Sequence, residues 1–275
     1  MTYYFYDENR VRYQLYRSKA GMAYNWLFFP GGPGADSRYL TSLIDTLDIP
    51  GNAWLIDLPG NGDNTENLPE GFSFDKWLEI LPTIPARFQN PIYVGHSFGG
   101  IMPLLFPELG QTLTGLVLLN TTPSLWFDAA REAAQKFQLP DLTSAMNGFT
   151  QNPMQVTFEN ALSACLPYYF PKKSLGLGSQ LLSGLPFPFQ VAAWGQMKAA
   201  EMCSRINWIP NNLPTMIVGG EYDAMTPFTL FRNDPRFKLP NINMFEIMGA
   251  GHMPWVEQPQ KVCQLFQEFA RKLSI

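Results

Sequence analysis

Six short apolar runs, each ending in turn residues, recur along the chain. They are rich in Val, Ile, Leu and Phe and nearly continuous rather than alternating, which is typical of strands buried on both faces of a parallel sheet. The runs are NWLFFPGGPG (25–34), AWLIDLPGNG (53–62), IYVGHSFGG (92–100), GLVLLNTTP (115–123), TMIVGGEYD (215–223) and INMFEIMGAGH (242–252). Helix-like stretches lie between them, for example at 36–46, 73–88 and 99–109. Strand alternating with helix predicts a doubly wound α/β fold with a mostly parallel sheet.

The alternation breaks once, between about Thr121 and about Asn212, where no buried strand is evident. This segment is rich in aromatic residues, Met and Pro, and its periodic parts, 126–137 and 191–206, have helical spacing. Two or three ordinary crossover helices would be too few for about 90 residues. We therefore expect a core formed by residues 1–120 and 213–275, with a helical insertion at 121–212.

The start of the chain is expected to form two strands, 2–6 and 10–16, joined at 7–9. Its sequence, MTYYFYDENRVRY, carries charges where a secretory signal needs an apolar core, so no signal peptide is expected. No apolar stretch reaches the ~18 residues that a membrane helix needs. We therefore expect a cytoplasmic protein without a membrane span.

Composition narrows the class further. The 275 residues are 46% hydrophobic and only 15% charged, as in a core-rich globular protein. A net charge of -4 without a Lys/Arg cluster argues against a nucleic-acid partner. The three cysteines, Cys165, Cys203 and Cys263, give neither a disulfide framework nor metal-ligand spacing. We interpret them as reduced thiols and expect no metal.

The third apolar run leads without a polar loop into Gly95-His96-Ser97-Phe98-Gly99-Gly100. G-x-S-x-G between a strand and a helix is the nucleophile-elbow pattern, in which small residues flank a serine on a strained, very tight turn. A plain glycine-rich turn is the alternative, but the strand before it and the helix after it favour the elbow. Ser97 is therefore the predicted nucleophile, at the positive end of the following helix.

A nucleophilic serine needs a base, and the chain has only two histidines. His96 is adjacent to Ser97, and at so tight a turn its side chain should point away, which suggests a structural or pocket-lining role. His252 follows the last apolar run, where Gly249 and Gly251 let the loop curl back towards the serine. His252 is the predicted general base.

The acid that orients the base is predicted to be Asp223, at the end of TMIVGGEYD. Asp57 precedes the serine in the chain and is interpreted as a loop-bracing carboxylate, and Glu221 is a weaker rival. Asn120, at the end of the preceding strand, cannot carry the charge. The resulting order of serine, aspartate and histidine differs from that of the other serine-triad folds.

An oxyanion hole is predicted in the loop Gly31-Gly32-Pro33-Gly34, which follows the first of the six runs. Its glycines can bring a backbone N–H close to a substrate carbonyl, and we favour Gly32 as the donor because Pro33 has none. The Phe98 N–H is the expected second donor. An ordinary Gly-Pro turn is the alternative interpretation of the loop alone.

Together these motifs resemble the α/β-hydrolase superfamily over nearly the whole chain. The closest pattern is that of the proline iminopeptidase-like group, whose loop usually reads His-Gly-Gly-Pro-Gly, although here Pro30 replaces the histidine. The resemblance implies an α/β-hydrolase fold, a serine hydrolase with a helical lid, and neither metal nor organic cofactor. A serine nucleophile disfavours epoxide hydrolases and haloalkane dehalogenases, whose nucleophile is aspartate.

The aromatic residues and methionines of the insertion favour an apolar or aromatic acyl group. The candidate substrate-binding residues are Trp126, Tyr168, Phe187 and Trp194. Aminopeptidases of this group bind a free amino terminus with lid carboxylates, and the candidates here are Asp128, Glu132, Glu159 and Glu201. Nothing in the sequence places these four in a pocket, and solvated helix-surface charges are the simpler interpretation.

Three functions remain open at this stage. We favour hydrolysis of an ester or thioester of an apolar or aromatic acyl group through an acyl-enzyme. An aminopeptidase or amidase of the proline iminopeptidase type is the first alternative, and a non-catalytic ligand-binding protein of the same fold is the second. In each case we expect a small-molecule substrate or ligand and a monomer or small homo-oligomer.

Overall fold

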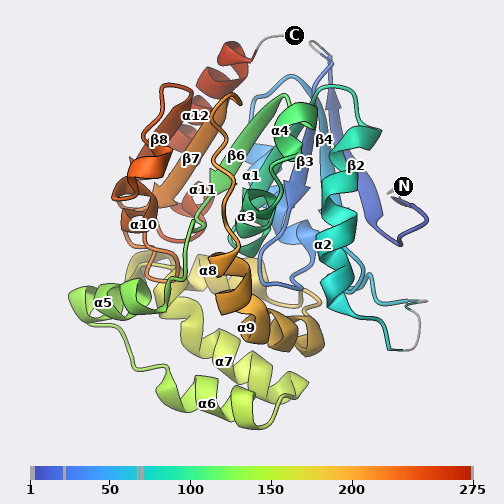
Figure 1. The fold of residues 1–275 in the computed structure, drawn as a ribbon. Helices are drawn as coiled ribbons and strands as arrows, with labels where there is room; N and C mark the ends of the chain where they lie inside the picture. Colours follow the sequence, from blue (N-terminus) through green and yellow to red (C-terminus); the bar gives the residue numbers. More distant parts are fainter. Residues whose placement is uncertain (1–3, 21–22, 67, 69–70, 274–275) are drawn as a thin grey trace.

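The computed structural model describes residues 4–20, 23–66, 68 and 71–273. Its centre is a single eight-stranded sheet with the order β1-β2-β4-β3-β5-β6-β7-β8 (Figure 1). The strands are β1 Tyr4–Tyr6, β2 Arg12–Lys19, β3 Asn25–Phe29, β4 Gly51–Asp57, β5 Pro91–His96, β6 Gly115–Leu119, β7 Thr215–Gly220 and β8 Ile242–Ile247. The pairs β1–β2 and β2–β4 are antiparallel and the others parallel, so the predicted mostly parallel sheet is confirmed. Residues 2 and 3 of the first predicted strand lie outside the described residues.

Helices cover both faces of the sheet (Figure 1). The α-helices are α1 Thr41–Thr46, α2 Trp77–Ile80, α3 Phe98–Ile101, α4 Leu109–Thr112, α5 Phe127–Phe137, α6 Thr143–Gln151, α7 Gln155–Tyr169, α8 Leu175–Leu182, α9 Phe189–Ser204, α10 Thr229–Arg232, α11 Pro254–Glu257 and α12 Pro259–Lys272. Short 3-10 segments connect them: η1 Ser37–Leu40, η2 Phe74–Lys76, η3 Leu81–Thr83, η4 Pro85–Arg87, η5 Met102–Leu105, η6 Lys172–Ser174 and η7 Pro235–Phe237.

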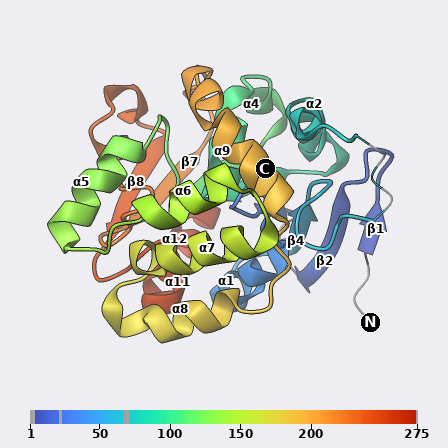
Figure 2. The ribbon, with the colours of Figure 1, turned by 90° about the horizontal axis from the view of Figure 1, so that it is seen from below.

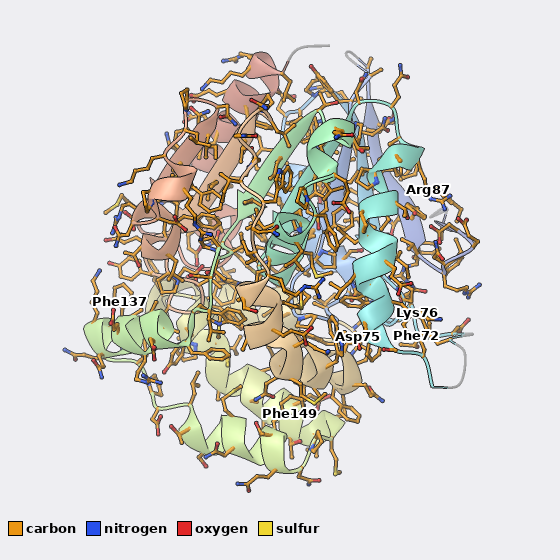
Figure 3. The ribbon with its side chains drawn as sticks, viewed as in Figure 1. Phe72, Asp75, Lys76, Arg87, Phe137 and Phe149 are labelled. Carbon is orange, nitrogen blue, oxygen red and sulfur yellow. The ribbon has the colours of Figure 1, made fainter. Side chains whose placement is uncertain are left out.

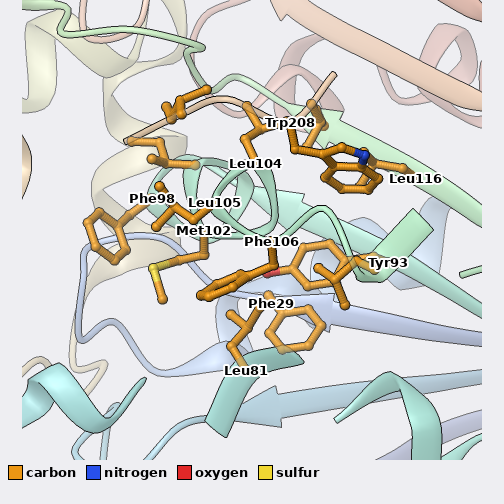
Figure 4. Close-up of a cluster of buried hydrophobic side chains, with 14 of the residues drawn as sticks. Phe29, Leu81, Tyr93, Phe98, Met102, Leu104, Leu105, Phe106, Leu116 and Trp208 are labelled. Carbon is orange, nitrogen blue, oxygen red and sulfur yellow. The ribbon is translucent and has the colours of Figure 1, made fainter. Parts of the chain in front are cut away.

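The parallel strands bury side chains on both faces, as their continuous apolar character predicts. In β3, Leu27 and Phe29 join the cluster under α2, α3 and α4, whereas Trp26 and Phe28 join the cluster under α1 and α12. Figure 4 shows part of the first cluster, where Phe29 lies beside Tyr93 of β5. Their rings stack with centroids 4.1 Å apart. This two-sided core fixes the strands whose carboxyl ends position the site.

Two of the predicted helices are broken into short turns. Residues 73–88 form η2, α2, η3 and η4, and residues 99–109 fall mainly within α3 and η5. Proline lacks the N–H that continues a helix and clashes with the preceding turn. Pro82 and Pro85 interrupt the first stretch, and Pro103 interrupts the second.

The helices α5 to α9 come from the predicted insertion and lie together beyond the carboxyl ends of the strands (Figures 1 and 2). Helix α9 is tied to the rest of the chain by Trp194, whose indole N–H donates to Asp75 Oδ1 at 3.0 Å. Asp75 lies next to the insertion in Figure 3, whereas Phe149 lies within it. The sheet and the five helices thus enclose the space into which the predicted nucleophile projects.

Candidate active site

Ser97 occupies the turn between β5 and α3 with φ 54° and ψ -123°, a conformation that is costly for a residue with a side chain. Its backbone N–H donates to Leu119 O at 2.9 Å, which anchors the turn to β6. A Cβ on Gly99 would lie 2.5 Å from Pro30 O, and one on Gly95 would collide with the Gly99 backbone. The two glycines are therefore required by close packing, as the elbow pattern predicts.

Asp223 and His252 form a buried pair, with His252 Nδ1 2.9 Å from Asp223 Oδ2. Burial alone would raise the pKa of Asp223, but the facing His252 and the hydrogen bonds that the carboxylate accepts hold it below its ordinary value. The donors include the backbone N–H groups of Met225 and Thr226, each 2.9 Å from Oδ1. The carboxylate is therefore charged and held in one orientation against the imidazole.

Asn120 has a role in the site that sequence reasoning missed. Its Nδ2 donates to Asp223 Oδ2 at 2.9 Å and to Gly251 O at 3.0 Å, so it bridges the acid and the loop of the base. The signal was present: Asn120 ends a strand that borders the strand leading to Asp223. An amide cannot carry the negative charge of the acid, but its Nδ2 group can donate the hydrogen bonds that hold that acid in place.

Ser97 and His252 line the same small cavity, of about 40 Å³, together with Gly31, Gly32 and Tyr39. Within the described residues, the hydrogen bonds of the His252 ring are made at Nδ1, to Asp223 and, at 3.4 Å, to Thr226 Oγ1. Among the hydrogen bonds of the described residues, none joins the His252 ring to Ser97 Oγ. Catalytic hydrogen bonds often reach full strength only in the substrate complex, so the shared cavity is the relevant observation.

The loop after β3 approaches the serine closely. A Cβ on Gly31 would lie 2.7 Å from Ser97 Cβ, and Gly32 has a φ of 114°, which favours glycine. The Gly31 N–H is occupied, because it donates to Tyr39 Oη at 2.8 Å. Neither the Gly32 nor the Phe98 N–H has an acceptor in the part of the chain that the structure describes. These are the two donors that the sequence predicts.

The second histidine, His96, is buried and belongs to a chain of three hydrogen bonds. Because a carbonyl oxygen can only accept, Nε2 of the neutral His96 ring carries the proton, and Nδ1 therefore accepts from Tyr39 Oη, 2.7 Å away. His96 Nε2–H then donates to His252 O at 2.9 Å. Burial, with a smaller contribution from His252, lowers the pKa of His96 to about 3. A neutral His96 thus links the Gly31 loop to the loop of the predicted base.

Asp57 and Glu221, the two other candidates for the orienting acid, each hold a loop in place through hydrogen bonds. Asp57 accepts from Ser37 N at 2.8 Å and from the Arg12 guanidinium at 2.9 Å, and burial raises its pKa to about 6. Glu221 Oε2 accepts from Gly249 N at 2.8 Å, within the loop that leads to His252. Neither residue lines the serine cavity.

An apolar cavity of about 290 Å³ adjoins the serine cavity, and Gly32, Tyr169 and Phe187 line both. Three of the four candidate substrate-binding residues, Trp126, Tyr168 and Phe187, line it. The carboxylates considered as amino-terminus ligands, Asp128, Glu132, Glu159 and Glu201, are all exposed and none lines it. None of the described residues that line the cavity carries a charged side chain.

Trp194, the fourth candidate, does not line this cavity. Its ring packs against Trp77 of α2, with centroids 5.4 Å apart, and its N–H is used by Asp75. Tyr169, which is not among the residues proposed from the sequence, lines both the apolar cavity and the serine cavity. Its ring centroid lies 4.9 Å from that of His252.

The last turn of α7 contacts both loops that carry Asp223 and His252. Ala224 N, directly after Asp223, donates to Tyr168 O at 3.1 Å, and His252 N donates to Tyr169 O at 2.7 Å. A Cβ on Gly251 would collide with Tyr169 O, so glycine is needed there. Carbonyl groups at a helix C-terminus lack intrahelical donors, and here two loops supply them.

The fold and the site define the class of this protein, and the comparison with known families agrees. Residues 26–265 match the model of the alpha/beta hydrolase family, and the chain belongs to that family. The predicted fold and the resemblance to this superfamily are thereby confirmed. The family assignment covers the elbow, the loop after β3 and the segments that carry Asp223 and His252.

Individual relatives extend this result. The chain is 34% identical to 3-oxoadipate enol-lactonase 1 of Acinetobacter baylyi, over 78% of this chain and 76% of that protein. It is 26% identical to the biotin biosynthesis bifunctional protein BioHC of Saccharophagus degradans, over 87% of this chain but 43% of that protein, so it spans less than half of that relative. A solved structure, a proline iminopeptidase-related protein from Thermus thermophilus, shares the fold with a TM-score of 0.70 and 18% identity, covering 99% of this chain and 98% of that chain.

None of the helices in the described ranges combines the length and the apolar character needed to cross a membrane.

Proposed function

We propose that this chain is a serine hydrolase that cleaves esters or thioesters of an apolar or aromatic acyl group. The observation that carries the proposal is the convergence of Ser97, the Asp223–His252 pair and the Gly32 loop on one cavity that adjoins an uncharged apolar one. Residues 121–212 would act as a lid, because four helices of this segment, α5, α6, α7 and α9, supply most of the apolar wall.

The proposed reaction proceeds through an acyl-enzyme. Ser97 Oγ attacks the ester carbonyl while His252 takes its proton, and Asp223 stabilises the imidazolium that forms. The negative charge on the carbonyl oxygen is received by the N–H groups of Gly32 and Phe98. His252 then donates the proton to the leaving oxygen, the bond to the alcohol breaks, and a water molecule releases the acid by the same steps in reverse.

The size of the apolar cavity sets the expected acyl group. If a methylene occupies the ~30 Å³ that a water molecule has in the liquid, a cavity of about 290 Å³ holds roughly nine or ten such groups. Acyl chains of roughly eight to ten carbons, or an aryl-alkyl acyl group of similar volume, therefore fit.

The aminopeptidase alternative receives less support. A substrate ammonium would have to enter the apolar cavity without a carboxylate partner, which is costly. The exposed positions of Glu132, Glu159 and Glu201 do not offer that partner. The loop histidine usual in the iminopeptidase-like group is also replaced, by Pro30.

The test begins with a fluorophosphonate probe, which labels an activated serine covalently. Wild-type protein should be labelled, Ser97→Ala should not, and Ser204→Ala, at an exposed serine of α9, should be labelled like wild type. Equal labelling of the Ser97→Ala variant would show that another residue is the nucleophile. Absence of labelling in the wild type as well would favour a non-catalytic binding protein.

Substrate class is then tested by p-nitrophenyl esters of increasing chain length and by amino-acid anilides. Hydrolysis should be most efficient for acyl chains of roughly eight to ten carbons. Because esters are intrinsically easier to cleave, free-amine prolyl anilide is compared with its N-blocked analogue. Strong cleavage of the free form with none of the blocked form would establish the aminopeptidase alternative.

A further inference from the structure

A second opening borders the serine cavity on the side of helices α7 and α8. It is a groove of about 210 Å³, and its lining residues are Leu162, Ser163, Leu166, Ser179, Leu182 and Ser183. Leu162 and Leu182 also line the cavity that contains Ser97 and His252. Leu182 is shared by the serine cavity and the groove alone, whereas Leu162 also lines the apolar cavity, so these two leucines, one from each helix, lie between the reacting centre and an open groove with three exposed serines.

The geometry of an ester at Ser97 assigns different directions to its two arms. The carbonyl carbon bears the acyl chain, the oxyanion and the leaving oxygen, and these diverge in the tetrahedral intermediate. The oxyanion faces Gly32 and Phe98, which border the apolar cavity where the acyl chain fits. The leaving oxygen must face His252, which lines the serine cavity but not the apolar one. Besides the apolar cavity, the serine cavity adjoins the groove between α7 and α8, which is thus available to the leaving group.

We propose that this groove binds the leaving group of the substrate, and that this group is a neutral alcohol bearing further hydroxyl groups, such as a glycerol moiety. The wall offers serine hydroxyls, which donate and accept hydrogen bonds, beside leucine side chains, and it carries no charged side chain. Leu162 and Leu182 part to admit the alcohol. This inference rests on the proposed serine-hydrolase function and adds the second half of the substrate to it.

The experiment compares 1-octanoylglycerol with methyl octanoate. Both esters form the same octanoyl-enzyme, so deacylation is common to them, and only kcat/KM reports the leaving group. The measured quantity is the ratio of kcat/KM for the glycerol ester to that for the methyl ester. Ser179→Trp fills the groove and should lower this ratio roughly tenfold, while methyl octanoate is still hydrolysed at near the wild-type rate.

The matched control is Gln180→Trp, at the next residue of α8, which is exposed but does not line the groove. It should leave the ratio unchanged. Retained methyl-ester hydrolysis shows that each variant is folded. A ratio in Ser179→Trp equal to that of wild type, or lowered equally in the control, would overturn the assignment of the groove.

A gain of function tests the same assignment independently. Ser179→Asp places a carboxylate in the groove and should raise kcat/KM for octanoylcholine relative to 1-octanoylglycerol several-fold, whereas Gln180→Asp should not. No change in Ser179→Asp would count against the groove. If wild type hydrolyses no ester, or if Ser97→Ala still hydrolyses esters, the proposed function is refuted instead. Failure of the groove assignment is therefore distinguishable from failure of the proposed function.

Discussion

Replacement of His96 by phenylalanine should change how the stability of the protein depends on pH. The His96 ring is buried against Tyr39, Trp255 and His252 and is neutral, with its pKa lowered to about 3 by burial. In the unfolded chain the same ring has an ordinary pKa of about 6.5. Between these two values the unfolded state binds a proton that the folded state does not.

The sign and size follow from this difference. Because the folded pKa of a basic group is depressed, acidification below about pH 6.5 favours the unfolded state, and the loss continues down to about pH 3. At pH 5 the loss from this residue is about 2 kcal/mol relative to pH 7. His96→Phe should lack this loss, although it is less stable at pH 7 by about 2–4 kcal/mol, since Tyr39 Oη and His252 O lose their partner.

Urea unfolding at pH 7 and pH 5 measures this effect as the change in free energy of unfolding. The change in free energy of unfolding of the variant is subtracted from that of wild type. This removes the contribution of Asp57, whose raised pKa makes the free energy of unfolding depend on pH in the opposite direction between about pH 4 and pH 6. Tyr39→Phe is the matched control, because it breaks the same hydrogen bond but keeps the titrating ring. The reasoning is refuted if His96→Phe loses as much stability as wild type between the two pH values.

Other perturbations test the site directly. Asp223→Asn should lower kcat by about 10⁴-fold with the fold unchanged by circular dichroism; a loss below tenfold would contradict its role as the orienting acid. Gly31→Ala should reduce fluorophosphonate labelling strongly, because its Cβ would press on Ser97; unimpaired labelling would contradict the close approach. Ala161→Phe, in the wall of the apolar cavity, should shift the preferred ester to shorter acyl chains; an unchanged chain-length profile would place the acyl group elsewhere.

The elbow was predictable from sequence because its cause is local. Gly95 is required by contact with the backbone of Gly99 and Gly100, within a few residues of Ser97, and the apolar run before it identifies the strand. Gly99 follows the same local pattern, although the atom that excludes a Cβ there is Pro30 O of the loop after β3. The acid and base segments were predictable for a related reason: each follows a continuous apolar run, and the carboxyl ends of parallel strands meet at one edge of the sheet. Two histidines in the whole chain left few alternatives.

What could not be predicted depends on tertiary packing. Trp194 lies on a helix with apolar residues on several sides, so periodicity could not distinguish the face towards the cavity from the face towards Trp77. Tyr169 and Asn120 reach the site through contacts with loops more than 80 residues away in sequence.

The two hydrogen bonds from the last turn of α7 have a consequence for protein engineering. Ala224 N donates to Tyr168 O, and His252 N donates to Tyr169 O. Both acceptors lie in the segment 121–212 and not in the part of the chain that forms the sheet. Specificity is often altered by exchanging such segments between relatives at their two junctions. In this chain a transplant that replaced the whole of 121–212 would also remove the main-chain support of the acid and base loops. A functional chimera must therefore keep the end of α7 and be joined within that helix.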